Sequence, residues 1–262
     1  MNNIRYDKIG ENYNRTRKAD PYIFQRLFEL LQTKEDGHYL DIGCGTGNYT
    51  ALFAEQGLMM SGMDPSSEML KKAEENQPDI LWLQGQAEKT GLPKNEFDGI
   101  VGSLTIHHWN NLLEGFKELY SILKPQSKLV LFTSDPQQME GYWLNHYFPS
   151  MMKASMALMP ELPLIKQALL AARFSNFVSE TYSVQEDLKD HFLYVGKYRP
   201  ELYLNPEIRN GISSFSLSTH QSEVHRGLKE LEKDIENKTI EKIVKQFENH
   251  NGDYLFITAD KN

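Results

Sequence analysis

Three features are scarce in this 262-residue sequence, and each scarcity excludes a class of protein. The single cysteine, Cys44, excludes an internal disulfide bond. No apolar run approaches the roughly 20 residues of a membrane-spanning helix, and the first residues lack the apolar segment of a signal peptide, so we expect a cytoplasmic protein without a membrane partner. Basic residues are also outnumbered by acidic ones, 28 to 36, which leaves a net charge of −8. Because a nucleic acid needs a concentrated basic face, we expect a small-molecule substrate instead.

Apolar segments of strand length alternate with segments of helical spacing over the first half of the chain. Strands are expected at 38–43, 58–64, 80–84, 97–103 and 128–134. Helices are expected at 47–56, 66–76 and 110–124. This alternation predicts an α/β fold with a doubly wound, mostly parallel sheet.

The remaining segments suggest a division of the chain into a core and a cover. The expected parts are an N-terminal helical segment, 1–35; an α/β core, 36–135, completed by 174–184 and 252–262; and a helical cover, 136–173 and 185–251. Half of the ten methionines lie in the stretch 139–159. Their flexible thioethers suit either ordinary helix packing or an apolar substrate pocket, and the sequence leaves both open.

The most informative stretch is Tyr39-Leu-Asp-Ile-Gly-Cys-Gly-Thr-Gly-Asn48, a buried strand that runs into a glycine-rich turn. Glycines at alternate positions (43, 45 and 47) permit a sharp turn and the close approach of a ligand to the main chain. The first strand-to-helix turn of an open α/β sheet is where nucleotide-like ligands bind. A dinucleotide fingerprint, G-x-G-x-x-G, would need a glycine at position 48, which is Asn48. The alternative is an ordinary glycine-rich turn.

The run D-I-G-C-G-T-G resembles motif I of the class I S-adenosylmethionine (SAM)-dependent methyltransferases. The resemblance is strong over 36–135 and weak over 174–184 and 252–260. It implies a Rossmann-like sheet with helical insertions, an antiparallel last strand, SAM as cofactor, and methyl transfer to a small-molecule acceptor. No metal is expected, because His107 and His108 have no third ligand at a plausible spacing.

The resemblance also assigns most of the cofactor-binding residues. The turn residues Gly43, Cys44 and Gly45 would line the cofactor, with Cys44 as a small pocket residue. Asp41 would hold the amino group of the methionine portion. The segment Gln84-Gly-Gln-Ala-Glu88 resembles the family's adenine-binding segment, although Gln86 stands where an acid is usual. Gln86 and Ala87 are therefore expected at the adenine.

Asp64 lies about 20 residues beyond the turn, where a ribose-binding acid belongs. A carboxylate there accepts hydrogen bonds from both ribose hydroxyls, and Pro65 would lie beside it. The alternative is that Asp64 caps the following helix. Near the start of the chain, Tyr13 and Arg17 would share a helical face. The resemblance implies that Arg17 binds the cofactor carboxylate, and the alternative is a surface helix with stray basic residues.

The segment Ser103-Leu-Thr-Ile-His-His-Trp109 follows the fourth expected strand and faces the position of the reactive methyl group. Ser103 is expected to contact the cofactor. His107 or His108 could accept a proton from the acceptor, since imidazole titrates near neutral pH. The alternative is that one histidine braces the loop. The sequence leaves two alternative functions open: a nicotinamide-dependent oxidoreductase and a non-catalytic SAM-binding protein.

Overall fold

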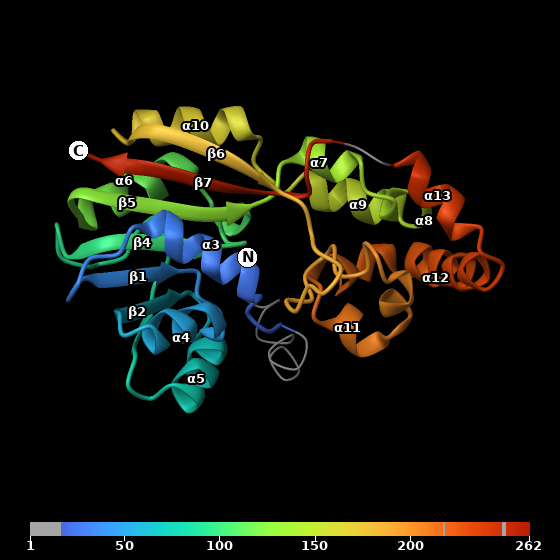
Figure 1. Cartoon of the computed structure of the whole chain (residues 1–262), viewed down its shortest axis with the longest axis horizontal. Helices are drawn as coiled ribbons and strands as arrows, with labels where there is room; N and C mark the ends of the chain where they lie inside the picture. The colour runs from blue at the N-terminus through green and yellow to red at the C-terminus, as the bar shows by residue number, and fades with distance from the viewer. Residues whose placement is uncertain (1–16, 217, 248–249) are drawn as a thin grey trace.

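The computed structural model describes residues 17–216, 218–247 and 250–262. Two parts lie side by side: a sheet with its flanking helices, and a group of helices beyond one end of that sheet (Figure 1). The expected segment 1–35 is only partly described, and Tyr13 lies outside the described residues. Among the described residues, no helix is both long enough and apolar enough to cross a membrane.

The sheet has seven strands in the order β3-β2-β1-β4-β5-β7-β6. Their bounds are β1 His38–Ile42, β2 Met59–Asp64, β3 Leu81–Gln84, β4 Phe97–Ser103, β5 Leu123–Thr133, β6 Ser175–Tyr182 and β7 Tyr254–Lys261. The pairs from β3 to β5 are parallel, whereas β7 runs antiparallel to both β5 and β6. The predicted doubly wound sheet with an antiparallel last strand is confirmed. The strand order reverses between β1 and β4, which is where such sheets bind ligands.

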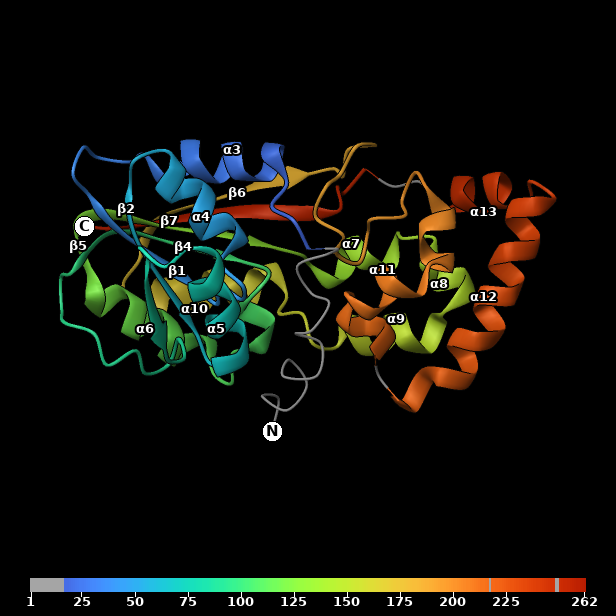
Figure 2. The same cartoon turned by 90° about the horizontal axis from the view of Figure 1, so that it is seen from below.

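Both faces of the sheet are covered by helices, as Figure 2 shows. The helices around the sheet are α3 Pro21–Leu31, α4 Asn48–Glu55, α5 Ser67–Asn76, α6 Leu112–Ile122 and α10 Leu162–Ala171. Alternate strand residues serve the two faces: Val130 and Phe132 join a cluster with α3 and α4, while Leu129 and Leu131 join one with α6 and α10. Burial on both faces explains why these strands are continuous apolar runs.

The cover consists of helices beyond the carboxyl ends of the parallel strands (Figure 1). They are α7 Pro136–Glu140, α8 Leu144–Tyr147, α9 Pro149–Met156, α11 Pro206–Asn210, α12 Gln221–Glu236 and α13 Ile240–Gln246. Two details differ from expectation. Residues 185–199 form loops instead of helix, and α10 packs against α6 and β6, so that it belongs to the sheet and not to the cover.

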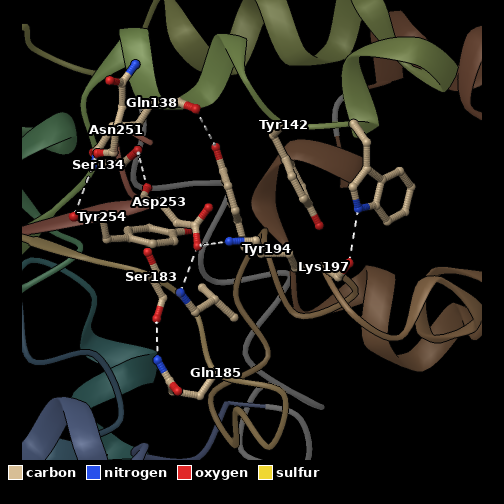
Figure 3. A network of polar contacts seen from close by, with 12 residues as sticks. Ser134, Gln138, Tyr142, Ser183, Gln185, Tyr194, Lys197, Asn251, Asp253 and Tyr254 are labelled. Carbon is tan, nitrogen blue, oxygen red and sulfur yellow. Dashed lines mark hydrogen bonds and ion pairs between the residues drawn. The ribbon is translucent and has the colours of Figure 1, made fainter. Parts of the chain in front are cut away.

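A buried polar network joins the cover to the sheet where β7 begins (Figure 3). The Asp253 carboxylate accepts hydrogen bonds from the Lys197 ammonium at 2.5 Å and from the Val184 main-chain N–H at 2.7 Å. From α7, the Gln138 side-chain amide donates to the carbonyl oxygens of Asn251, at 2.8 Å, and Tyr254, at 3.0 Å. Because Asp253 and Gln138 are buried, each depends on these partners for the hydrogen bonds that water would otherwise supply.

We expect Asp253→Ala to lower the free energy of unfolding by about 2–3 kcal/mol, because it leaves Lys197 and the Val184 N–H without an acceptor. Urea denaturation followed by circular dichroism measures the loss. The control is Glu114→Ala, which removes an exposed ion pair with Lys117 and should cost less than about 1 kcal/mol. Equal losses in the two variants would contradict the role given to Asp253.

Candidate functional site

A cavity of about 210 Å³ opens at the carboxyl ends of the parallel strands, between the sheet and the cover. Ten of the thirteen residues predicted from the sequence line it: Arg17, Asp41, Gly43, Cys44, Gly45, Asp64, Pro65, Ser103, His107 and His108. Gln86 and Ala87 do not line this cavity. Gln86 is exposed, and Ala87 is buried in the apolar cluster that includes residues of α6 and α10. Their assignment to the adenine therefore stays a prediction.

The three glycines of the turn have left-handed backbones, with φ of 71° at Gly43, 56° at Gly45 and 77° at Gly47. A Cβ at Gly43 would lie 1.9 Å from the Thr105 hydroxyl oxygen, and one at Gly47 would lie 2.3 Å from the Trp82 ring. A Cβ at Gly45 would meet no protein atom within 4 Å. Gly43 and Gly47 are thus required for packing inside the protein, whereas Gly45 keeps the cavity wall open to a ligand.

Cys44 is part of this cavity wall, and burial together with the charges of Asp41 and Asp64 raises the pKa of its thiol well above the ordinary value. The thiol is therefore protonated at neutral pH, which makes it a poor nucleophile. This agrees with the predicted role of Cys44 as a small pocket residue.

Asp64 joins the glycine turn to the helix that follows β2. One carboxylate oxygen accepts the Gly45 N–H at 2.9 Å, and the other accepts the Ser66 N–H at 2.9 Å. The N-cap of α5 is Ser66, whose hydroxyl accepts the Met69 N–H, so Asp64 is not itself the cap. Burial raises the pKa of Asp64, and the two N–H donors oppose that rise. The carboxylate is held in place at the cavity wall.

Asp41 is a second carboxylate in the same wall, and it is only 3% exposed. One of its oxygens accepts a hydrogen bond from the Thr50 hydroxyl at 2.6 Å. Burial raises the pKa of Asp41 to about 7, with a further contribution from the charge of Asp64. A cation bound in the cavity would favour the ionised form, so ligand binding and deprotonation are coupled.

Arg17 lines the cavity in an arrangement that the sequence does not predict. It is extended, in a β-bridge with Asp190, so the expected helical face at Arg17 is wrong. Its guanidinium contacts both oxygens of the buried Asp190 carboxylate, at 2.5 and 3.4 Å, and the Tyr49 hydroxyl donates to one of them at 3.3 Å. Binding of a cofactor carboxylate by Arg17 stays a prediction, but the paired Asp190 would share that guanidinium.

His107 and His108 end a short 3₁₀ helix, Ile106–His108, directly beyond β4. Their ring centroids are 3.8 Å apart, and both side chains are half-buried. The preceding Leu104 has a φ of 50°, unusual for a residue with a side chain, and its N–H donates to the Phe132 carbonyl oxygen at 2.8 Å. This tight loop places both histidines at the cavity wall.

A second set of lining residues, here called the cover wall, was not predicted from the sequence. Eight of its members come from the cover, whereas Ser134 directly follows β5 and Tyr254 begins β7. The members are mostly apolar or aromatic and carry five hydroxyl groups: Ser134, Met139, Met159, Phe192, Leu193, Tyr194, Ile212, Ser213, Ser214 and Tyr254. Met151 and Met152 are buried in the apolar core, which agrees with ordinary helix packing. Met139 and Met159 line the cavity, and their role in a substrate pocket stays a prediction.

Comparison with known proteins identifies the family. A family model described as a methyltransferase domain matches residues 40–131. A crystal structure named "Putative methyltransferase from antibiotic biosynthesis pathway", from Anabaena variabilis, superposes with a TM-score of 0.83 at 32% identity, covering 93% of this chain and 98% of that one. The chain belongs to the class I SAM-dependent methyltransferases.

Other relatives agree with this family. The "Putative methyltransferase YqeM" of Bacillus subtilis is 36% identical over 133 residues, which are 48% of this chain and 53% of that protein. The first curated relatives are matched over little more than half of their length. A phosphoethanolamine N-methyltransferase of Haemonchus contortus, bound to S-adenosylhomocysteine, has a TM-score of 0.61 at 17% identity, covering 97% of this chain and 57% of that one, and supports the fold alone.

We expect Gly45→Val to weaken SAM binding by about tenfold or more, because its side chain would fill the open side of the turn. The matched control is Gly57→Val. Gly57 also has a positive φ, 84°, and open space at its Cβ, but it lies at the end of α4 and does not line the cavity. Both variants carry similar backbone strain, so calorimetric titration with SAM separates occlusion from strain. Equal affinities in the two variants would contradict the turn as the cofactor site.

The raised pKa of Asp41 predicts a pH-dependent affinity. Below about pH 7 the carboxyl group is protonated in the empty site, and it cannot pair with a cationic ligand. The Kd for SAM should therefore rise about tenfold as pH falls from 8 to 6. In Asp41→Asn, SAM should bind more weakly, and only the pH dependence of the ligand's own amino group should remain. Calorimetry across this pH range measures both, and an identical pH dependence in the two proteins would refute the assignment.

Proposed function

We propose that this protein transfers the methyl group of SAM to a small-molecule acceptor held between the glycine turn and the cover. The observation that carries the proposal is the make-up of one continuous cavity. Its sheet side contains the glycine turn, the buried Asp41 and the half-buried Asp64, and its cover side is mostly apolar and aromatic. The two sides suit a charged, nucleoside-like ligand and an acceptor, respectively.

The residues at the sheet side fit the parts of SAM one by one. The Asp64 carboxylate is fixed by two N–H donors, and the remaining lone pairs of its oxygens can accept the ribose hydroxyls. Asp41, in its ionised form, would hold the ammonium group, and the open backbone at Gly45 would let the ligand lie against the turn. Gln86 and Ala87 are proposed to border the adenine beyond the cavity.

Methyl transfer from SAM requires little of the protein beyond the alignment of the acceptor with the methyl group. SAM supplies a methyl group already activated by its sulfonium centre. The cavity walls would hold the acceptor in line with that carbon and exclude water, and alignment contributes several kcal/mol to such reactions. His107 and His108 lie at the same cavity, where either imidazole could remove a proton from an acceptor hydroxyl or amine. The buried Cys44 thiol is unsuited to a covalent step.

The position of Asn48 argues against the nicotinamide-dependent alternative. A dinucleotide fingerprint has its third glycine there, where it lets the helix pack closely on the strand. Asn48 instead begins α4, and its side-chain amide donates to the Arg17 carbonyl oxygen at 2.5 Å and to the Thr46 hydroxyl at 3.3 Å. A side chain with two partners in the protein thus stands where that fingerprint has none.

Calorimetric titration with SAM and, separately, with NADH tests the proposal. We expect SAM to bind and NADH not to bind. Asp64→Asn should weaken SAM binding by about 10- to 100-fold, because it removes a charged hydrogen-bond acceptor. The control is the Glu114→Ala variant, which removes the exposed ion pair with Lys117 and should bind SAM as the unaltered protein does. NADH binding would overturn the proposal. SAM binding without S-adenosylhomocysteine formation in the presence of every acceptor tried would favour a non-catalytic role.

A further inference from the structure

The charged groups at the cavity disfavour the binding of an anionic acceptor. Among the described residues, the side chains that line it include three aspartates, at 41, 64 and 190, and two basic residues, Arg17 and Lys18. The half-buried Arg17 is engaged by the buried Asp190 in a two-point ion pair. Lys18 is exposed, so its ammonium is solvated and not held by the protein. The described cover wall therefore offers no fixed cation to a phosphate or carboxylate, and burial of an unpaired anion is costly.

The cover wall is aromatic and is held rigid by ring stacking. Tyr194 stacks on Tyr142 with ring centroids 3.8 Å apart and planes at 11°. Tyr254 stacks on Phe132 at 5.2 Å and meets the edge of Phe192 at 4.7 Å. The polar network of Figure 3 holds the same segments, because the Gln138 amide donates to the Tyr254 carbonyl oxygen and the Lys197 ammonium donates to Asp253. A wall of this kind offers a preformed flat apolar surface, which favours ring-containing ligands.

One polar group in this wall remains available to a ligand. Tyr254 is 3% exposed and lines the cavity, and its hydroxyl makes no hydrogen bond to the residues that the structure describes. The neighbouring Tyr194 hydroxyl differs, because it donates to the Gln138 carbonyl oxygen at 3.4 Å. Burial raises the pKa of Tyr254 well above its ordinary value, so this hydroxyl stays protonated and acts as a donor. Buried tyrosine hydroxyls ordinarily have a partner, and here the ligand would supply it.

We propose that the acceptor is an uncharged, largely apolar ring compound, and that the Tyr254 hydroxyl donates a hydrogen bond to its polar group. This inference rests on the proposed methyltransferase function and narrows its substrate class. Tyr254 determines specificity in this proposal. It selects a neutral oxygen or nitrogen acceptor, while the apolar wall and the two carboxylates of the sheet side disfavour phosphorylated and carboxylated analogues.

Three probes of one ring system test the proposal: 2-naphthol, 2-naphthoate and 2-naphthyl phosphate. Each is titrated calorimetrically at pH 8 into protein saturated with S-adenosylhomocysteine. We expect 2-naphthol to bind, and the two anions to bind at least about tenfold more weakly. In Tyr254→Phe, the Kd for 2-naphthol should rise about fivefold, the effect of one neutral hydrogen bond, with the affinity for S-adenosylhomocysteine unchanged.

The control variant is Tyr142→Phe, which removes a buried hydroxyl from the same aromatic cluster. The Tyr142 hydroxyl bonds that of Tyr203 at 2.5 Å and does not line the cavity, so 2-naphthol should bind this variant as it binds the unaltered protein. Equal or tighter binding of an anionic probe, no binding of any probe, or equal effects of the two substitutions would each overturn the inference. Failure of S-adenosylhomocysteine itself to bind would instead count against the proposed function.

Discussion

The hydrogen bond from the Gly45 N–H to the Asp64 carboxylate is the contact on which the site depends. It joins the turn after β1 to the end of β2, two segments that are adjacent in the sheet but 19 residues apart in the chain. The bond holds the turn in a shape that only glycine adopts at low cost. It also fixes the carboxylate where a sugar diol would lie. Strand pairing, turn geometry and the charge of the site are thus set together.

Burial of two carboxylates near one another has an electrostatic cost, and the structure shows how that cost is distributed. Asp64 has two main-chain donors, whereas Asp41 has one hydroxyl donor. Asp41 therefore carries the larger perturbation and titrates near neutral pH. A cationic ligand removes this penalty, so the empty site stores part of the free energy that binding recovers.

The sequence predicts the sheet and its cofactor side well, because both depend on local patterns. Apolar runs, turn glycines and Asp64 lie within one stretch of chain, and each has a spacing with a physical reason. Arg17 shows the limit of such reasoning. Its partner, Asp190, is 173 residues away, and no local pattern reports a pairing of that range. The bridge to Asp190 also overrides the helical spacing expected around Arg17.

The aromatic wall could not be located for the same reason. Phe192, Tyr194 and Tyr254 come from an irregular loop and from the start of the last strand, and only the folded chain brings them together. Met139 and Met159 were visible as part of a methionine-rich stretch, but composition does not distinguish a pocket-lining thioether from one in the core.

The cover enters the chain as two insertions, one between β5 and α10 and one between β6 and β7 (Figure 1). The turn, both sheet-side carboxylates and the histidine loop all precede residue 109. Most residues of the cover wall therefore lie in different parts of the chain from those proposed to hold the methyl donor, and Tyr254, at the start of β7, is an exception. An engineer seeking new acceptors would diversify the two insertions together with Tyr254 and leave the first 109 residues unchanged.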